Sequence, residues 1–330
     1  MSRPTLQQLS YLVALADEGH FGRAADACSV SQPGLSSQIL ELERRLGLTL
    51  IERLAKGARL TPEGSDVVAR ARRILSEVDE LIDATQTGAN GLVGPLNVGA
   101  IPTAAPYVLG DFVPTILRTH PNVSLRFEEL ITRELLASLR SGQLDLGICA
   151  LPVEGHDIVG VPVLNDHFLL AFSMRNELAR ADGPVSQTVL RNLNVLLLDE
   201  GHCLRDQALA LCASVRVQPT DLRATSIPTL VQMVAADVGV TLLPVTAAAV
   251  EARSGNGIAV RPIKQAPKRT LALVWRASSP RDGLYRSLAR DFSTALARFA
   301  RPNELAEQTL NLDGLVRRGS FPAEAELRPR

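Results

Sequence analysis

A long segment with an unbroken helical pattern, residues 62–87, most constrains how this chain of 330 residues can fold. Thr61 and Pro62 suit a helix start, and the next break comes only at the glycine-rich stretch 88–95. Apolar residues recur in it at intervals of four and three, the heptad spacing of helices that pair. Such a stripe packs either on its own domain or on a second copy. We expect a dimer seam formed by Val67, Ala71, Ile74, Val78 and Leu81.

This helix divides the chain into unlike parts. We expect a small helical domain at residues 1–61, the helix at 62–87, a hinge at 88–93 and a larger domain at 94–300. Residues 301–330 are polar, with scattered leucines among Pro, Glu and Arg. We expect a flexible C-terminal extension there and assign it no role.

Composition narrows the function classes. Apolar residues make up 46%, enough to fill real cores, but no apolar run is long enough to predict a membrane span. The start of the chain lacks a signal pattern, and four irregularly placed cysteines do not form an extracellular disulfide framework. We therefore expect a cytoplasmic protein. Because 35 basic and 35 acidic residues cancel, contact with a polyanion requires a local basic patch.

The first sixty residues have the pattern of a winged helix-turn-helix. An amphipathic stretch at 6–16 and an alanine-rich stretch at 22–28 precede a turn, and Ser31 is a candidate N-cap of a third helix. In that helix Leu35, Ile39, Leu42 and Leu46 form one buried stripe. The opposite face is small and polar at its start, which suits insertion into a major groove.

A basic wing follows the third helix. Two short strand-like runs meet at a glycine, and Arg53, Lys56 and Arg59 lie around them, where they can contact phosphates. The alternative is a small helical module that docks protein, because residues 1–60 carry seven basic and six acidic side chains.

Residues 94–300 alternate short strands with helices, which favours a doubly wound α/β fold. The strand-like runs are at 96–99, 124–127, 144–148, 168–172, 195–198 and 239–243. The helical segments are at 105–119, 132–141, 203–211 and 229–236.

Cys203 and Cys212 are nine positions apart in one predicted helix, so about 13.5 Å of helix axis separates them. A disulfide needs α-carbons within roughly 7 Å, so joining the pair would unwind the helix. Cys203 falls in the first turn, where backbone N–H groups, Arg205 and a protonated His202 favour a thiolate. A thiolate attacks peroxide to give a sulfenic acid, which a second thiol converts to a disulfide. Cys212 is the natural second thiol.

The other cysteines and the histidines suggest no further site. Cys28 and Cys149 lie in apolar runs typical of inert buried thiols. The histidines outside the 203–212 helix have no companions at ligand spacing, so we expect no metal and no cofactor. They are His20, His120, His156 and His167.

An ordered set of motifs over the first sixty residues resembles the LysR-type transcriptional regulators. It comprises Phe21-Gly22-Arg23-Ala24-Ala25, Val30-Ser31-Gln32-Pro33-Gly34-Leu35-Ser36, Leu50-Ile51-Glu52-Arg53 and Leu60-Thr61-Pro62-Glu63-Gly64. The resemblance implies base contacts around Gln32, Pro33 and Ser36, with Ser37 on the same exposed face, and backbone contacts near Arg53.

For the remainder of the chain the same resemblance implies a two-lobed sensor like a periplasmic solute-binding protein. The overall class is then α+β and multi-domain: a winged helix-turn-helix, a linker helix and a two-lobed α/β sensor domain. We expect lobe I at about residues 94–166 and 269–300 and lobe II at about 167–268, with crossings near His167 and Lys268.

A second set of motifs resembles the peroxide-sensing members of that family. Gly201-His202-Cys203-Leu204-Arg205-Asp206-Gln207-Ala208 is followed by Cys212 and by Arg223-Ala224-Thr225-Ser226. The resemblance makes Cys203 the peroxidatic and Cys212 the resolving cysteine, and it places Thr103 and Thr132 in a peroxide pocket with His202, Arg205 and Asp206. Thr132 could instead be only a helix cap. The loop 213–222 lacks a histidine often found in better-known relatives.

The sequence therefore predicts a peroxide-responsive regulator of transcription. Its expected partners are double-stranded DNA with two-fold symmetric half-sites, hydrogen peroxide, further copies of itself as a dimer or tetramer, and RNA polymerase. One alternative is a regulator of the same family that binds a small metabolite between its lobes. An enzyme, a thiol peroxidase, is disfavoured because a catalyst has no need of a DNA-binding module.

Overall fold

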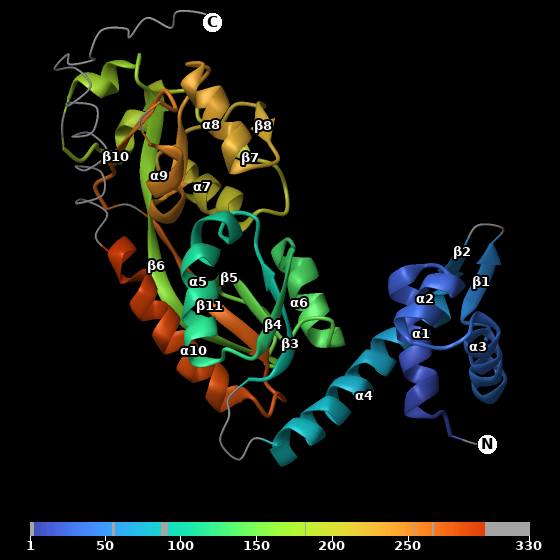
Figure 1. Ribbon diagram of the computed structural model, residues 1–330. Coiled ribbons are helices and arrows are strands. Elements are labelled where there is room, and N and C mark those ends of the chain that lie inside the picture. The colour runs from blue at the N-terminus through green and yellow to red at the C-terminus, as the bar shows by residue number, and fades with distance from the viewer. Residues whose placement is uncertain are drawn as a thin grey trace, which may run out of the picture.

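The computed structural model describes residues 3–54, 57–86, 92–181, 183–253, 255–265 and 267–300. It has a winged helix-turn-helix at the N-terminus, a long helix α4 and a two-lobed α/β domain (Figure 1). Lys56, most of the expected hinge and the expected C-terminal extension lie outside the described residues. Within these ranges, no helix is long and apolar enough to cross a membrane.

The N-terminal module packs three helices against a two-stranded wing. Its elements are α1 (Leu6–Glu18), α2 (Phe21–Ala27), α3 (Gln32–Leu46), β1 (Ile51–Leu54) and β2 (Gly57–Leu60). Leu35, Ile39 and Leu42 of α3 are fully buried, as their spacing predicts. The Ser31 side chain accepts a hydrogen bond from the Gly34 N–H, so the predicted N-cap is confirmed.

Helix α4 (Pro62–Gln86) changes its environment along its length. The Thr61 hydroxyl caps it by accepting from the Gly64 N–H at 2.9 Å. Ala71, expected in the dimer seam, is buried in the core of its own N-terminal module, where α4 packs on α1. Further along the same stripe, Ile74 and Leu81 are 43% and 66% exposed. The first half of the helix therefore completes a domain, and the second half leaves apolar residues uncovered in a single chain.

One seven-stranded sheet runs through both lobes. Its order is β10-β6-β11-β5-β3-β4, with β9 also paired to β6. The strands are β3 (Gly94–Ala100), β4 (Val123–Glu129), β5 (Leu146–Leu151), β6 (Ile158–Ser173), β9 (Thr241–Pro244), β10 (Ile258–Pro262) and β11 (Lys268–Arg276). A separate parallel pair joins β7 (Leu197–Leu198) and β8 (Arg223–Ala224).

Strand β6 connects the two lobes. Its first part pairs antiparallel with β11 up to His167 opposite Lys268. From Phe168 onward it pairs with both β9 and β10, and the two pairings overlap along the strand. The sequence predicts a strand only at 168–172. Pro162 and the polar pair Asn165-Asp166 interrupt the apolar pattern before it. The structure accommodates this interruption with a register shift opposite Leu271 and Ala272.

Helices cover the sheet in both lobes, as Figure 1 shows. Lobe I carries α5 (Ala105–Thr119), α6 (Thr132–Ser141) and α10 (Asp282–Ala295), and lobe II carries α7 (Cys203–Ser214), α8 (Ile227–Ala235) and α9 (Val245–Glu251). Short 3₁₀ turns lie at Glu177–Arg180, Gln187–Asn192 and Leu296–Ala300. The lobes also touch through α5 and α9, where the Tyr107 hydroxyl donates to Glu251 Oε1 at 2.9 Å.

Removing the Ser31 cap should loosen the start of α3. We expect Ser31→Ala to destabilise that helix end by about 1 kcal/mol, because the Gly34 N–H loses its acceptor. Hydrogen exchange at the amides of residues 34–36 should then speed up by roughly fivefold. Ser37→Ala, on the exposed face of the same helix, is the matched control and should leave exchange there unchanged.

Candidate functional site

Cys203 is the first residue of α7 and lies where lobe II meets the start of α6. His202 occupies the N-cap position, and the preceding Gly201 adopts a left-handed φ of +91°. A Cβ at Gly201 would lie 3.3 Å from Ile131 Cδ1, so the loop approaches the start of α6 closely. The half-buried thiol packs against the main core of the sensor domain.

Both cysteines of the predicted pair lie on one intact helix. All four cysteines are free thiols, and α7 runs without interruption from Cys203 to Ser214. Nine residues of α-helix separate the two α-carbons by about 13.5 Å along the axis. Cys212 is buried in the sensor core, and its backbone carbonyl accepts from the Val217 N–H. The separation predicted from sequence is therefore present in the structure.

A buried ion pair lies behind Cys203. Arg269 of β11 and Asp166 of β6 have fully buried side chains, and Nη2 of the arginine is 2.9 Å from Oδ2 of the aspartate. The guanidinium also donates to the Thr103 hydroxyl and the Thr103 carbonyl, each at 3.0 Å. The Thr246 N–H and hydroxyl donate to the two oxygens of Asp166. One network thus joins β6, β11, α9 and the turn that carries Thr103.

The electrostatic balance at Cys203 differs from the sequence expectation. Burial raises the pKa of the Cys203 thiol above its ordinary value, and Asp206 also raises it. The Arg269 guanidinium, a hydrogen bond with the Thr103 hydroxyl and the Leu204 N–H lower the pKa of the same thiol. Burial is the largest of these effects, so the pKa of the thiol is raised overall, although the Leu204 N–H at the start of α7 lowers it in the direction that the sequence predicts.

The cation beside the thiol is Arg269, not Arg205 as predicted. Arg205 donates from Nη1 to the Leu198 carbonyl at 3.1 Å, and its Nη2 is 3.9 Å from Glu200 Oε1. It therefore holds the loop before α7 in place. Sequence reasoning missed Arg269 because β11 is distant in the chain. The only signal for Arg269 in the sequence was the cluster of charged residues at the predicted crossings between the two lobes.

The other residues predicted for the pocket, Thr103, Asp206 and Thr132, differ from one another in burial and hydrogen bonding. Thr103 is buried against Arg269, and Asp206 is exposed on α7. Thr132 is the first residue of α6 and Ile131 is the N-cap, so the alternative role of Thr132 as a cap was wrong. Within the described ranges, the buried Thr132 Oγ1 has no hydrogen-bond partner. A buried hydroxyl without a partner is uncommon in folded proteins.

Cys149 of β5, assigned no role from the sequence, lies near the same pocket. Burial raises the pKa of its thiol to about 12, and Cys203 adds to that shift. Cys149 therefore stays protonated at neutral pH. Across the described ranges, no three His, Cys, Asp or Glu side chains are grouped so that they could hold a metal ion.

The N-terminal module presents the predicted small polar surface. Gln32, Pro33 and Ser37 are exposed at the start of α3, and Arg59 is exposed on the wing. Arg53 Nη1 donates to the Ser36 hydroxyl at 3.1 Å, and its guanidinium lies 4.7 Å from the centre of the Phe21 ring. Arg53 thus links the wing to the start of α3.

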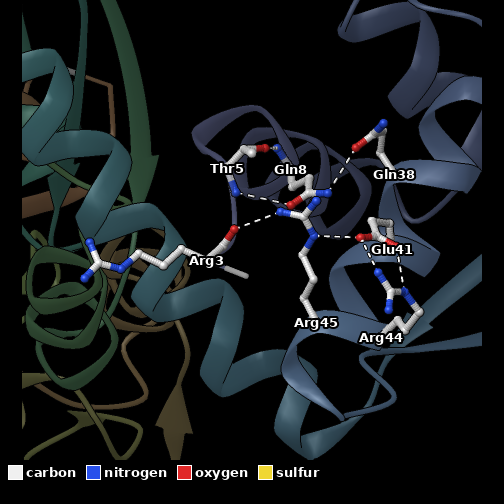
Figure 2. Close-up of polar contacts among 7 residues, drawn as sticks. All are labelled: Arg3, Thr5, Gln8, Gln38, Glu41, Arg44 and Arg45. Atoms are coloured by element: carbon white, nitrogen blue, oxygen red, sulfur yellow. Dashed lines mark hydrogen bonds and ion pairs between the residues drawn. The ribbon is translucent and has the colours of Figure 1, made fainter. Parts of the chain in front are cut away.

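Figure 2 shows a second polar cluster, between α1 and the middle of α3. Glu41 accepts from Arg44 and Arg45, and these bonds lower the pKa of its carboxyl to about 2. Arg45 also donates to the Arg3 carbonyl, and Gln8 donates to Gln38. Because Glu41 neutralises much of their charge, Arg44 and Arg45 are weaker candidates for phosphate contacts than Arg53 and Arg59.

A helix-turn-helix joined by a long helix to a two-lobed α/β domain defines a class of DNA-binding regulators with a sensor domain. The family model for the bacterial regulatory helix-turn-helix protein of the lysR family matches residues 6–65, and the LysR substrate binding domain model matches residues 89–298. The chain belongs to the LysR family.

Individual relatives are similar over most of their length. The hydrogen peroxide-inducible genes activator of Pectobacterium carotovorum is 41% identical over 86% of this chain and 94% of its own length. The DNA-binding transcriptional dual regulator OxyR of Escherichia coli K12 is 41% identical over 86% of this chain and 93% of its own.

Solved structures of the same kind are similar too. A cysteine-to-aspartate variant of full-length OxyR from Pseudomonas aeruginosa has a TM-score of 0.79 at 38% identity, covering 92% of this chain and 98% of that one. A hydrogen peroxide-bound variant of Corynebacterium glutamicum OxyR has a TM-score of 0.63 at 33% identity, covering 94% and 98%.

Replacing Thr103 should slow the chemistry of Cys203. Thr103→Val keeps the side-chain volume but removes the hydroxyl that lowers the pKa of the thiol, so that pKa should rise. Because only the thiolate reacts, alkylation of Cys203 by iodoacetamide at neutral pH should slow by up to about tenfold and recover as the pH is raised. Cys28, in the N-terminal module, is the internal reference and should react at an unchanged rate.

Proposed function

We propose that this chain is a peroxide-responsive, DNA-binding regulator of transcription, switched by oxidation of Cys203 and its bonding to Cys212. One observation carries the proposal: an unbroken helix holds the two thiols apart, with Cys203 placed against Arg269 and Thr103. Relatives that match most of the chain bear the name hydrogen peroxide-inducible genes activator.

The chemistry has two balanced steps. The Cys203 thiolate attacks one oxygen of hydrogen peroxide, the O–O bond breaks, and the hydroxide that leaves takes up a proton to become water. The resulting Cys203 sulfenic acid is then attacked by the Cys212 thiol, which forms the S–S bond and releases a second water. Two observations support a small hydrogen-bonding substrate here: Thr103 acts on the thiol, and the hydroxyl of Thr132 has no partner at the start of α6, which the loop before Cys203 approaches closely.

Forming the disulfide would reorganise α7. The two α-carbons must approach within roughly 7 Å, which an intact helix does not allow. Leu204, Ala208 and Leu211, buried on the same helix, would leave their present packing as it unwinds. Closing a loop of about ten residues also costs around 3 kcal/mol of chain entropy. In this proposal the reduction of peroxide to water supplies the driving force for that cost and for the lost burial of these side chains.

The N-terminal module is the part that binds DNA in this proposal. We infer that α3 enters the major groove through Gln32, Pro33, Ser36 and Ser37, while Arg53 and Arg59 contact phosphates. The exposed Ile74 and Leu81 on the second half of α4 support pairing with a second copy, with Val78 on the same stripe. Two modules would then bind half-sites related by two-fold symmetry. The active assembly is inferred to be a cytoplasmic dimer or tetramer that acts with RNA polymerase.

Brief peroxide treatment tests the switch. We expect mass spectrometry to find a Cys203–Cys212 disulfide, and hydrogen exchange of the α7 amides to rise at least tenfold as the helix opens. Cys203→Ser and Cys212→Ser are the controls, and neither should show the increase. A bond through Cys28 or Cys149, or full protection of α7 in the bonded form, would contradict the proposal.

Substitutions in the N-terminal module should separate base recognition from phosphate contact. Gln32→Ala should relax base preference, a loss of about 1–3 kcal/mol at the affected base pair. Arg59→Ala should weaken binding to all sequences alike and reduce the salt slope by about one. Arg44→Ala, whose charge Glu41 already neutralises, is the matched control and should change the slope least. Equal salt slopes for both arginine variants would count against a phosphate-binding wing.

A further inference from the structure

Asp166 is a buried carboxylate at the position where β6 leaves lobe I. Its side chain is fully buried, and the described contacts connect it to Arg269 and Thr246. It reaches Cys203 only through Arg269 and Thr103 among these contacts. Asp166 is therefore a buried charge that acts on the reactive thiol through an intermediate residue. Its role differs from that of the pocket residues.

The carboxylate is held from two sides. Oδ2 accepts from Arg269 Nε at 3.0 Å, from Arg269 Nη2 at 2.9 Å and from the Thr246 hydroxyl at 2.8 Å. Oδ1 accepts from the Thr246 N–H at 3.1 Å, at the start of α9. Asp166 is thus immobilised by lobe II on one side and offers an oxygen to Arg269 on the other.

Fixing one edge of Arg269 orients the other. The guanidinium is planar and rigid, so two bonds to Asp166 set the direction of Nη1, which donates to Thr103 Oγ1 at 3.0 Å. A threonine hydroxyl has one proton. Since Thr103 Oγ1 accepts from Nη1, its own proton is free to be donated toward the sulfur of Cys203, whose pKa this hydroxyl lowers.

We propose that Asp166 is a positioning residue for the oxidation of Cys203: by holding Arg269 it directs the Thr103 hydroxyl proton and the guanidinium charge at the sulfur. This inference rests on the proposed function of Cys203. Asp166 consumes no proton or electron in the reaction. It stabilises the arrangement in which the thiolate, the nucleophile of the first step, is solvated by the protein.

Several groups face the sulfur and would share in any pH dependence. Arg269 faces it from β11, Thr103 from the turn before α5, Cys149 from β5, and Asp206 and the Leu204 N–H from α7. Of these, Arg269 and Thr103 both favour the thiolate and both hydrogen-bond within the Asp166 network. Loss of Asp166 should therefore act on both at once.

Two substitutions distinguish a role of Asp166 in positioning Arg269 through its charge from a role in packing alone. Asp166→Asn keeps the size and shape of the side chain but removes the charge-assisted acceptor for Arg269. Asp166→Glu keeps the carboxylate but adds a methylene in a fully buried site. If Asp166 were only a packing residue, Asn would be tolerated and Glu would be worse. If Asp166 positions Arg269, Cys203 should react more slowly in the Asn variant than in the Glu variant, which keeps the carboxylate.

The measurement is the pH profile of Cys203 alkylation in the full chain, followed peptide by peptide with Cys28 as internal reference. Loss of the Asp166 negative charge alone would move the midpoint down, so an upward shift is specific to lost positioning of Arg269 and Thr103. In Asp166→Asn we expect the midpoint to move up by about one pH unit and the rate at neutral pH to fall about tenfold. Asp166→Glu should stay within about threefold of the parent. A parent-like or faster Asp166→Asn, or a Glu variant as slow as the Asn variant, would overturn the inference.

A milder variant keeps the test decisive if Asp166→Asn does not fold. Thr246→Val removes the hydroxyl bond to Oδ2 and leaves the ion pair in place, and it should slow alkylation of Cys203 by about threefold. An unchanged profile for this variant would overturn the inference in that case. Failure of the parent Cys203 to react with peroxide would instead refute the proposed function, while the alkylation profiles would still report on Asp166.

Discussion

The buried pair of Arg269 and Asp166 is the interaction on which the arrangement of the sensor domain depends. Two charges without solvent are stable only if every donor and acceptor around them is used, and removing one partner strands the other. Here Thr246 and Thr103 complete the set, so the pair joins β6, β11, α9 and the turn beneath Cys203. The pair lies next to the position where β6 passes between lobes, so the geometry of the crossing and of the thiol site are set together.

That coupling explains how a chemical event at one sulfur can have a mechanical result. Cys203 begins a helix whose buried face is part of the lobe II core, and Cys212 lies near the end of the same helix. In the proposed switch this packing of α7 is lost when the two sulfurs join, because an intact helix keeps their α-carbons too far apart. A helix with a large apolar burial surplus would resist such a change. The buried side chains of α7 are Leu204, Ala208, Leu211 and Cys212, and this is the packing that the proposed unwinding would disrupt.

In the N-terminal part of the molecule, helix α4 has two roles. Helix α4 contributes Val68 and Ala71 to the core of the N-terminal module and then presents Ile74 and Leu81 to solvent. One helix thus belongs to a folded domain and also has an exposed apolar surface, on which we propose that a second copy packs. The rigidity of a continuous helix then fixes the orientation of the DNA-binding module relative to that surface.

The sequence by itself determined the features that depend on local periodicity. The spacing of Leu35, Ile39 and Leu42, the Ser31 cap, the long helix and the separation of the two cysteines all follow from positions close together in the chain. Only the tertiary structure decided which cation faces Cys203, because Arg269 is far from it in sequence and is brought there by strand pairing. Arg205, the near neighbour, binds the Leu198 carbonyl instead. The net pKa of the thiol was equally inaccessible, since burial is a property of the folded packing and outweighs the helix terminus.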